Sequence, residues 1–439
     1  LFFYCLLIFL NQKSASLGVL RLFNRFDLVA MNTLTIPFTR MAGCGIAWAL
    51  DAPFWIYMAV WFTGSAISYL TLPVLAYFEL KRRDLLKEVT DGRLTLKGGV
   101  REILASSYLE ALGVNTSKSF ALIETGEQLA RNDEPSPTRS AVLTRLSHSH
   151  IRFGSFQRLA YLEGWEAMAQ LIDYCVAEFH PWAEDPDMTT KACKLLESVA
   201  TATGRMIGQW MAAGFVHGVM NTDNFNITGE TFDFGPWRFL PVSDPNFTAA
   251  YFDQQGLYRF GRQPVQGGWA LQQLASALLA TGADADDLAK ALAPYQLAYR
   301  DSFIAHTHAL LGIAPAGEAE EDAGFLQAFY GWMTESEAAW PQVFHDWFGG
   351  AASEARAAAS PQAALYEGEA FAPVKAQILA RDPVQPGRLA HAIFKRAVPP
   401  SLLIDEVEAL WAPIAEADDW SALDERLADI EALRIARWS

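Results

Sequence analysis

The chain has 439 residues, which is enough for two or three ordinary domains around a large core. Its composition is that of a globular protein, with 51% hydrophobic and 19% charged residues. The net charge of −16 provides no general attraction for nucleic acid, and no basic stripe interrupts it, so we expect no nucleic-acid partner. The four cysteines lack metal-ligand or CxxC spacing, which is typical of buried thiols in a reducing compartment such as the cytoplasm.

The first 90 residues differ in composition from the rest of the chain. Residues 1–10 are wholly apolar, and residues 52–78 hold no charge over a length that could span a bilayer, with a basic run directly after them. One interpretation is a membrane anchor that leaves the remainder in the cytoplasm. The alternatives are a buried apolar segment or a stretch foreign to the rest of the protein.

From Asp91 onward the pattern is that of an α+β protein. Helical spacing, strand-like apolar runs and stop residues such as Gly113 alternate along the chain. The expected elements are a helix over 100–112, strands over 118–125 and 141–146, and long helices over 155–180 and 187–213. After Gly268 the chain is rich in Ala and Leu, acidic and helical.

The segment 214–236, GFVHGVMNTDNFNITGETFDFGP, carries the strongest functional pattern. It follows a long helix and contains His-Gly, a loop that ends in Asn, a short hairpin and Asp-Phe-Gly, which is the order of a kinase-like catalytic segment. Phosphoryl transfer depends chiefly on metal ligands and placed charges. Asn224 and Asp233 offer hard oxygen ligands that could hold Mg²⁺ against a triphosphate. Taken singly, the alternative is ordinary turn chemistry.

The position of the kinase base is altered. Small-molecule kinases have His-Gly-Asp there, whereas this chain has His217, Gly218 and Val219 at the same spacing from Asn224. Valine cannot accept a proton, so a kinase base is absent. Asp223 lies directly beside the expected metal ligand. The chemistry has therefore been lost or has moved to another carboxylate.

A second pattern lies in LTRLSHSHIRFGSF, residues 143–156. Arg145 and Arg152 lie seven residues apart, across an expected strand end and turn, and could face one polyanion, since a guanidinium offers phosphate a bidentate fork. The alternative for each is a solvated surface charge. His148 and His150 are expected to pack or hydrogen-bond locally rather than to bind a metal.

Four blocks together resemble the selenoprotein O family, in family order and spacing. They are residues 91–102, 142–157, 215–240 and 258–271. The resemblance covers roughly 91–310 and implies a protein-kinase-like fold that binds ATP in a reversed orientation. It implies transfer of AMP, rather than the γ-phosphate, to hydroxyl side chains (Ser, Thr or Tyr) of proteins.

By position, the resemblance also implies roles for single residues. Asp223 would be the general base, and Asn224 and Asp233 would hold Mg²⁺, with Mn²⁺ as the alternative. The residues implied to bind the nucleotide are Asp91, Gly92, Arg145, Arg152 and Asp233. Glu102 matches the helix glutamate that pairs with a small-lobe lysine, for which Lys81 is the nearest candidate.

The chain departs from the family in its first part. Lys81 lacks the glycine that follows the family's lysine, the family's glycine-rich approach to the nucleotide is absent, and no cysteine lies near the C-terminus. We therefore expect a two-lobed kinase-like fold with a degraded or replaced small lobe and a mostly helical large lobe. The expected domains are 1–90, an apolar or foreign segment; 91–160, the rest of the small lobe; 161–310, the catalytic large lobe; and 311–439, a helical extension.

The leading hypothesis for function is a Mg²⁺- and ATP-dependent protein adenylyltransferase. A catalytically impaired pseudokinase or nucleotide-binding scaffold is the alternative, since the roof over the nucleotide is in doubt. A kinase that transfers the γ-phosphate is a further alternative, and Val219 argues against it.

Overall fold

The structure is a computed structural model that describes residues 26–82, 93–130 and 136–438. The chain divides into two compact units, Leu1–Arg93 and Leu94–Ser439. Asp91 and Gly92, which the sequence places at the nucleotide, lie outside the described residues, and so does the side chain of Lys81.

The first unit contains a helical hairpin in its described part. Helix α3 (Phe26–Ala49) packs against α4 (Phe54–Arg82). Polar contacts join the two helices: Asn32 Nδ2 donates to Ser68 Oγ at 3.2 Å, and the Arg40 guanidinium lies over the Trp61 ring. Among residues 26–82 the structure has helices and no strand. No helix in the described part of the chain combines the length and the apolar character needed to cross a membrane.

The second unit is mixed, with a small sheet and many helices, which confirms the predicted α+β class. Its strands are β1 (Leu94–Thr95), β2 (Lys118–Leu129), β3 (Thr138–Leu146), β4 (Phe215–Val216) and β5 (Arg238–Phe239). Its first helices are α6 (Leu96–Ala111), α7 (Phe153–Tyr161), α8 (Trp165–Phe179), α9 (Met188–Ala213), α10 (Gln263–Leu278), α11 (Ala285–Ala291) and α12 (Pro294–Leu311). The later helices are α13 (Ala319–Ser336), α14 (Trp340–Asp346), α15 (Glu354–Ala358), α16 (Ala363–Tyr366), α17 (Ala372–Leu379), α18 (Ile404–Ala417) and α19 (Ser421–Trp438).

Helix α6 covers one face of a three-stranded antiparallel sheet of order β1-β3-β2. The helix begins where the Thr95 side chain accepts a hydrogen bond from Gly98 N at 3.0 Å, a standard N-cap. A Cβ on Gly99 would lie 2.3 Å from Leu122 Cδ1, so this glycine allows the helix to approach β2 closely. Arg145 lies opposite Ser119 in the register, and its ion pair with Glu102 of α6 shows that its side chain is on the face that α6 covers.

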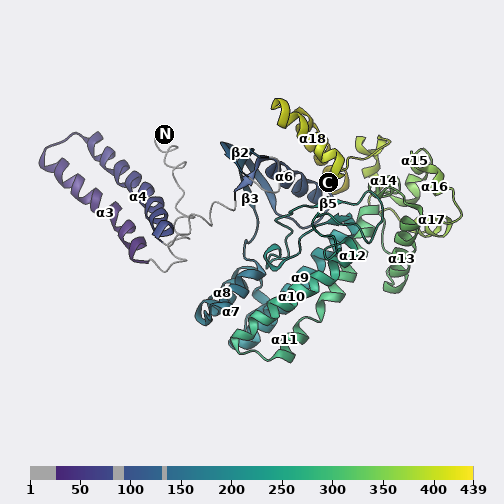
Figure 1. Cartoon of the computed structure of the whole chain (residues 1–439), viewed down its shortest axis with the longest axis horizontal. Coiled ribbons are helices and arrows are strands. Elements are labelled where there is room, and N and C mark those ends of the chain that lie inside the picture. Colours follow the sequence, from purple (N-terminus) through teal and green to yellow (C-terminus); the bar gives the residue numbers. More distant parts are fainter. Residues whose placement is uncertain (1–25, 83–92, 131–135, 439) are drawn as a thin grey trace. The chain divides into compact units, whose positions relative to one another are not determined.

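Helix α9 is the centre of the helical part, and α12 runs along it (Figure 1). The Asp187 side chain caps the start of α9, and Gly214 ends it in the left-handed conformation at φ 66°. A Cβ on Gly208 would lie 2.7 Å from the Tyr299 carbonyl oxygen, and Gly204 meets Tyr295 in the same way. The two glycines therefore let the backbones of α9 and α12 come close together.

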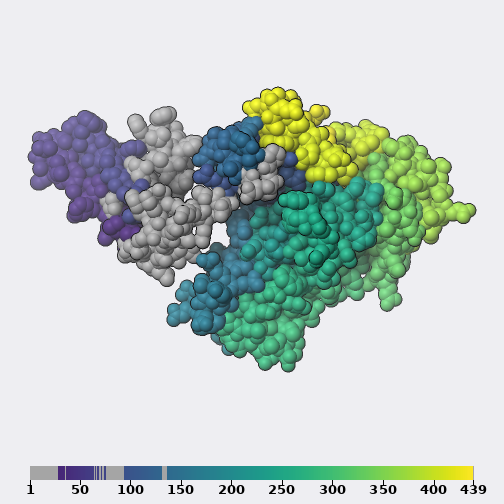
Figure 2. Space-filling model, in the orientation of Figure 1, coloured from purple at the N-terminus to yellow at the C-terminus, as the bar shows by residue number. Residues whose placement is uncertain are grey.

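The C-terminal helices return to the start of the second unit. Figure 2 shows the yellow C-terminal segment against the blue segment that includes α6. Lys97 Nζ lies 2.7 Å from Glu408 Oε2, and Trp438 Nε1 donates to Ala111 O at 2.9 Å. Segments more than 300 residues apart in sequence thus share one core.

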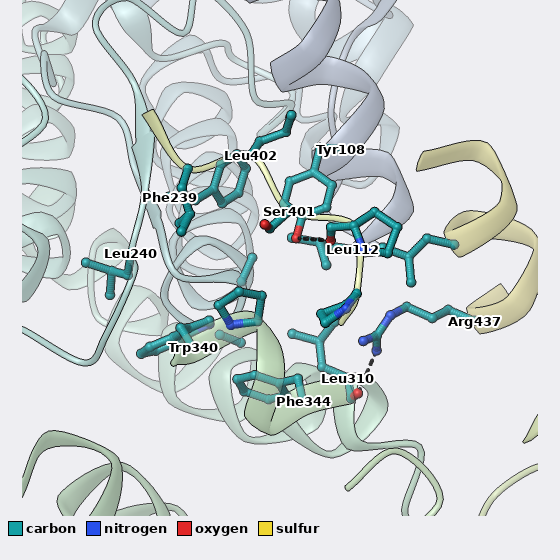
Figure 3. Close-up of a pocket in the computed structure, with 17 residues that line it drawn as sticks. Tyr108, Leu112, Phe239, Leu240, Leu310, Trp340, Phe344, Ser401, Leu402 and Arg437 are labelled. Carbon is teal, nitrogen blue, oxygen red and sulfur yellow. Dashed lines mark hydrogen bonds between the residues drawn. The ribbon is translucent and has the colours of Figure 1, made fainter. Parts of the chain in front are cut away.

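A small cavity of about 30 Å³ lies where α6, α9, α12, α14 and α19 meet (Figure 3). The buried Arg437 guanidinium donates to Leu310 O at 2.6 Å, and Tyr108 Oη donates to Pro400 O at 3.3 Å. Burial lowers the pKa of Arg437 to about 10. None of the residues that the sequence analysis assigns to catalysis lines this cavity.

Candidate active site

The candidate site is built on the loop between two short paired strands. β4 and β5 pair antiparallel, with Phe215 opposite Phe239, and both rings are buried. The two ends of the loop from His217 to Trp237 therefore lie side by side in the core. For this reason Asn224 and Asp233 belong to one closed loop that is anchored at both ends.

Hydrogen bonds fix the turn that holds Asn224. Its Nδ2 donates to the Val219 carbonyl oxygen at 2.8 Å, and its backbone N donates to Asn221 O at 2.9 Å. Tyr258 Oη donates to Asn221 Oδ1 at 2.7 Å from the segment that follows the loop. Because the amide nitrogen of Asn224 is engaged by Val219, its Oδ1 is the atom left to face a cation.

His217 packs in the core at the start of the loop. The residue is buried, and its ring lies 5.3 Å from the Trp210 ring. Gln263 holds its backbone, since Gln263 Oε1 accepts from His217 N at 3.0 Å while Nε2 donates to Phe215 O at 2.8 Å. Burial lowers the pKa of His217 to about 4, so the imidazole is neutral at physiological pH. His217 is thus a packing residue in this structure.

Asp233 has an uncommon backbone conformation. Its φ is +56°, in the left-handed region that few residues other than glycine adopt. The neighbouring Phe232 and Phe234 rings are buried, while the Asp233 side chain stays 45% exposed. Arg152 Nη2 lies 3.3 Å from Asp233 Oδ2, and the Arg152 guanidinium lies 5.0 Å from the centre of the Phe232 ring. The predicted phosphate ligand and the predicted metal ligand therefore lie side by side.

Glu102 and Arg145 form a second ion pair behind the first. Glu102 is on α6 and Arg145 is on β3, and both side chains are largely buried. Burial raises the pKa of Glu102 to about 7, and the negative charge of Asp233 adds to the effect, while the Arg145 guanidinium opposes it. The described partner of Glu102 is thus Arg145, whereas the predicted pairing with Lys81 falls on a side chain outside the described residues.

Glu230 holds the turn between the two arginines, and sequence analysis missed it. Its carboxylate accepts from Ser147 Oγ and from the backbone N of His148, both at 2.8 Å, and pairs with His148 Nδ1 at 2.8 Å. Burial alone would raise the pKa of Glu230, but these hydrogen bonds outweigh it and hold the pKa below its usual value. The local role expected of His148 agrees with this contact. In the sequence, only the position of Glu230 three residues before Asp233 indicates a role near the site.

A short antiparallel backbone contact joins the segment around Arg152 to the loop around Asn226. Phe153 N donates to Phe225 O at 3.1 Å, and Ile227 N donates to Ile151 O at 2.9 Å, so Arg152 pairs with Asn226. This contact brings the start of α7 against the loop that carries Asp223 and Asn224. Asp223 itself is exposed and lies against Gly154 in the first turn of α7.

The donor set fits Mg²⁺ better than a transition metal. Asn224 and Asp233 supply an amide oxygen and a carboxylate, and Mg²⁺ is commonly held by one or two such ligands together with waters and substrate phosphates. Within the described residues, no group of three or more His, Cys, Asp or Glu side chains is arranged to hold a metal. A divalent ion here would therefore need the oxygens of a bound nucleotide.

Comparison with known proteins decides the family. A sequence model described as protein adenylyltransferase SelO matches residues 87–431. The chain belongs to this family. The predicted membership of the selenoprotein O family is confirmed, and with it the nucleotidyltransferase class.

Individual SelO relatives agree with the family match. The protein nucleotidyltransferase YdiU of Synechocystis sp. is 36% identical over 357 residues, which are 78% of this chain and 74% of the relative. The protein of the same name from Gloeobacter violaceus is 38% identical over 341 residues, or 75% of this chain and 69% of the relative. That of Synechococcus elongatus is 52% identical over a shorter stretch of 175 residues, 40% of this chain and 35% of the relative.

Proposed function

We propose that this chain is a protein adenylyltransferase that transfers AMP from ATP to hydroxyl side chains of proteins, with Asp223 as the general base. The proposal rests mainly on the replacement of the kinase base by valine in a chain of the SelO family. Val219 occupies the position of a kinase base, while Asp223 lies beside the candidate metal ligand Asn224. The names of the relatives, protein nucleotidyltransferase, support the same reaction class.

The proposal includes a two-lobed, protein-kinase-like architecture. The sheet β1-β3-β2 with α6 would be the remainder of a small lobe, and the helices around α9 would be the large lobe. The loop with Asn224 and Asp233 lies where these two parts meet, since Arg145 and Arg152 reach it from β3 and from the start of α7. This position suits a nucleotide held between the lobes.

Each charged side chain has a separate task in this proposal. Arg152 and Arg145 would bind phosphate oxygens, because a guanidinium offers parallel N–H groups to them. Asn224 and Asp233 would hold Mg²⁺, which when bound neutralises charge on the phosphates and orients them. Arg152 lies 3.3 Å from Asp233, so a phosphate bound through a metal at Asp233 would lie close to the guanidinium.

The transfer step requires a proton acceptor beside the acceptor hydroxyl. Asp223 accepts the hydroxyl proton as the hydroxyl oxygen forms a bond to the α-phosphorus. The bond between the α-phosphorus and the oxygen that bridges to the β-phosphate breaks, and pyrophosphate leaves. A base placed in this way typically contributes about 10²–10⁴-fold to the rate. Asp223 is exposed, so a protein hydroxyl can reach it from solvent.

A nucleotide-binding protein impaired in catalysis is the second candidate. It is favoured by the sequence before Asp91, which lacks the family's glycine-rich approach to the nucleotide, and by residues 26–82, which form two helices and no strand. A γ-phosphate kinase has less support, because the side chain at Val219 cannot accept a proton.

Labelled ATP separates these candidates. The full chain is incubated with Mg²⁺, a mixture of acceptor proteins, and ATP labelled at either the α- or the γ-phosphate. We expect acceptor proteins to gain the α-label and not the γ-label, and Asp223→Asn to abolish the gain. Transfer of the γ-label would identify a kinase. Binding of ATP without transfer of either label would favour the impaired nucleotide-binding protein.

A further inference from the structure

Gly154 lies directly against the carboxylate of Asp223. It is the second residue of α7, and a Cβ built on it would lie 1.9 Å from Asp223 Oδ1 and 2.9 Å from Asp223 Cγ. Real atoms do not approach so closely, so the Asp223 carboxylate occupies the space that a side chain at position 154 would need. The contact joins a helix start to a loop almost 70 residues further along the chain.

The backbones on both sides of this contact are held in place. Thr222 Oγ1 donates to Gln157 Oε1 at 2.5 Å, which fixes the loop to the second turn of α7. On the other side, Phe153 N donates to Phe225 O at 3.1 Å, and both of these rings are buried and stacked. The end of the Asp223 side chain is therefore the part that can yield if position 154 gains an atom.

The local backbone gives no reason for a glycine here. Position 154 is helical, and it is not among the glycines with positive φ. Glycine in a helix costs roughly 0.5–1 kcal/mol relative to alanine. The close approach of Asp223 is the feature that explains the residue.

We infer that Gly154 is a positioning residue for the base: its missing side chain lets the Asp223 carboxylate rest on the first turn of α7. Phe153 N and Ser155 N of that turn already have carbonyl acceptors, so the partial positive charge of the helix start is what favours a negative charge nearby. A side chain at position 154 turns the carboxylate away from this place. The three atoms nearest to a Cβ at position 154 all belong to Asp223, so the change acts first on this carboxylate, and nucleotide binding should stay intact. The inference rests on the proposed function of Asp223.

The test is a double-mutant cycle in the full chain with Gly154→Ala and Asp223→Ala. We expect Gly154→Ala to lower kcat for α-label transfer by roughly 10- to 100-fold, as expected for a misplaced catalytic group. The Kd for Mg²⁺-ATP should stay within about 2-fold of wild type, and Tm should not fall, since alanine favours the helix. In the Asp223→Ala background, Gly154→Ala should cause no further loss, because the displaced carboxylate is already gone.

Gly324→Ala is the matched control, since Gly324 is also helical and a Cβ there meets no atom within 4 Å. It should leave kcat unchanged. Normal kcat in Gly154→Ala, a parallel loss of ATP binding, or an additive loss in the double variant would each overturn the inference. Full activity of Asp223→Ala would instead overturn the assignment of the base in the proposed function. The two failures are therefore distinguishable.

Discussion

The Arg145 guanidinium on β3 forms a buried ion pair with the Glu102 carboxylate on α6. The two residues are 43 positions apart, and the pair lies next to the Phe234 ring and near Asp233. One of the two arginines expected at the phosphates is thus held by a carboxylate whose charge depends on pH near neutrality.

The first prediction concerns the pH dependence of stability. Burial raises the pKa of Glu102 to about 7, above the unfolded value of 4.5. Its contribution to folding is therefore fully present below pH 4.5 and is lost as pH rises through 7. Relative to Glu102→Gln, the wild type should lose about 1–3 kcal/mol of unfolding free energy between pH 5 and pH 8. Urea unfolding of both proteins at several pH values measures this difference. A difference that does not change with pH would contradict the assignment.

The second prediction concerns Glu230, which holds the turn between Arg145 and Arg152. Glu230→Gln keeps the size of the side chain but removes the charge that four donor atoms share. We expect ATP affinity to fall about 10-fold, equivalent to about 1.4 kcal/mol, because both arginines lose a fixed support. Titration with Mg²⁺-ATP measures the change. Glu320→Gln, at an exposed position on α13, is the control and should have no effect.

The third prediction separates charge from backbone conformation at Asp233. Its φ of +56° is tolerated by Asn but disfavoured for Ala. Both Asp233→Asn and Asp233→Ala should weaken Mg²⁺-dependent ATP binding by at least about 10-fold, since each removes the carboxylate. Only the Ala variant should also lose stability, by about 1 kcal/mol. Calorimetric binding with and without Mg²⁺, together with thermal unfolding, checks both parts. Unchanged binding in Asp233→Asn would rule out a metal role for this residue.

The fourth prediction concerns the contact between α9 and α12. A Cβ on Gly208 would lie 2.7 Å from the Tyr299 carbonyl oxygen and 2.8 Å from Phe303 N, which are backbone atoms that cannot turn aside. Gly208→Ala should therefore destabilise the protein by about 1–3 kcal/mol, despite the better helix propensity of alanine. Denaturant unfolding measures this. Gly324→Ala, which meets open space, should be neutral or slightly stabilising, and equal effects of the two changes would argue against the close approach.

Local sequence was sufficient for most of the elements, but the long helix expected over 155–180 was wrong, because the chain breaks there into α7 and α8 at Gly164. The periodicity predicted helices over 100–112 and 187–213, which the structure has as α6 and α9 with somewhat different starts. The strands expected at 118–125 and 141–146 are present and longer. These predictions succeed because hydrophobic period, capping residues and glycine stops act over a few residues.

The sequence by itself therefore determined the family, the α+β class, and the placing of Val219, Asp223, Asn224 and Asp233 on one short loop. Only the tertiary structure decided which side chains support them. The pairing of Glu102 with Arg145, the hold of Glu230 on the turn at His148, and the contact of Gly154 with Asp223 join segments 43 to 82 residues apart. No local pattern encodes such contacts, because they depend on how the sheet, α6 and α7 pack around the loop.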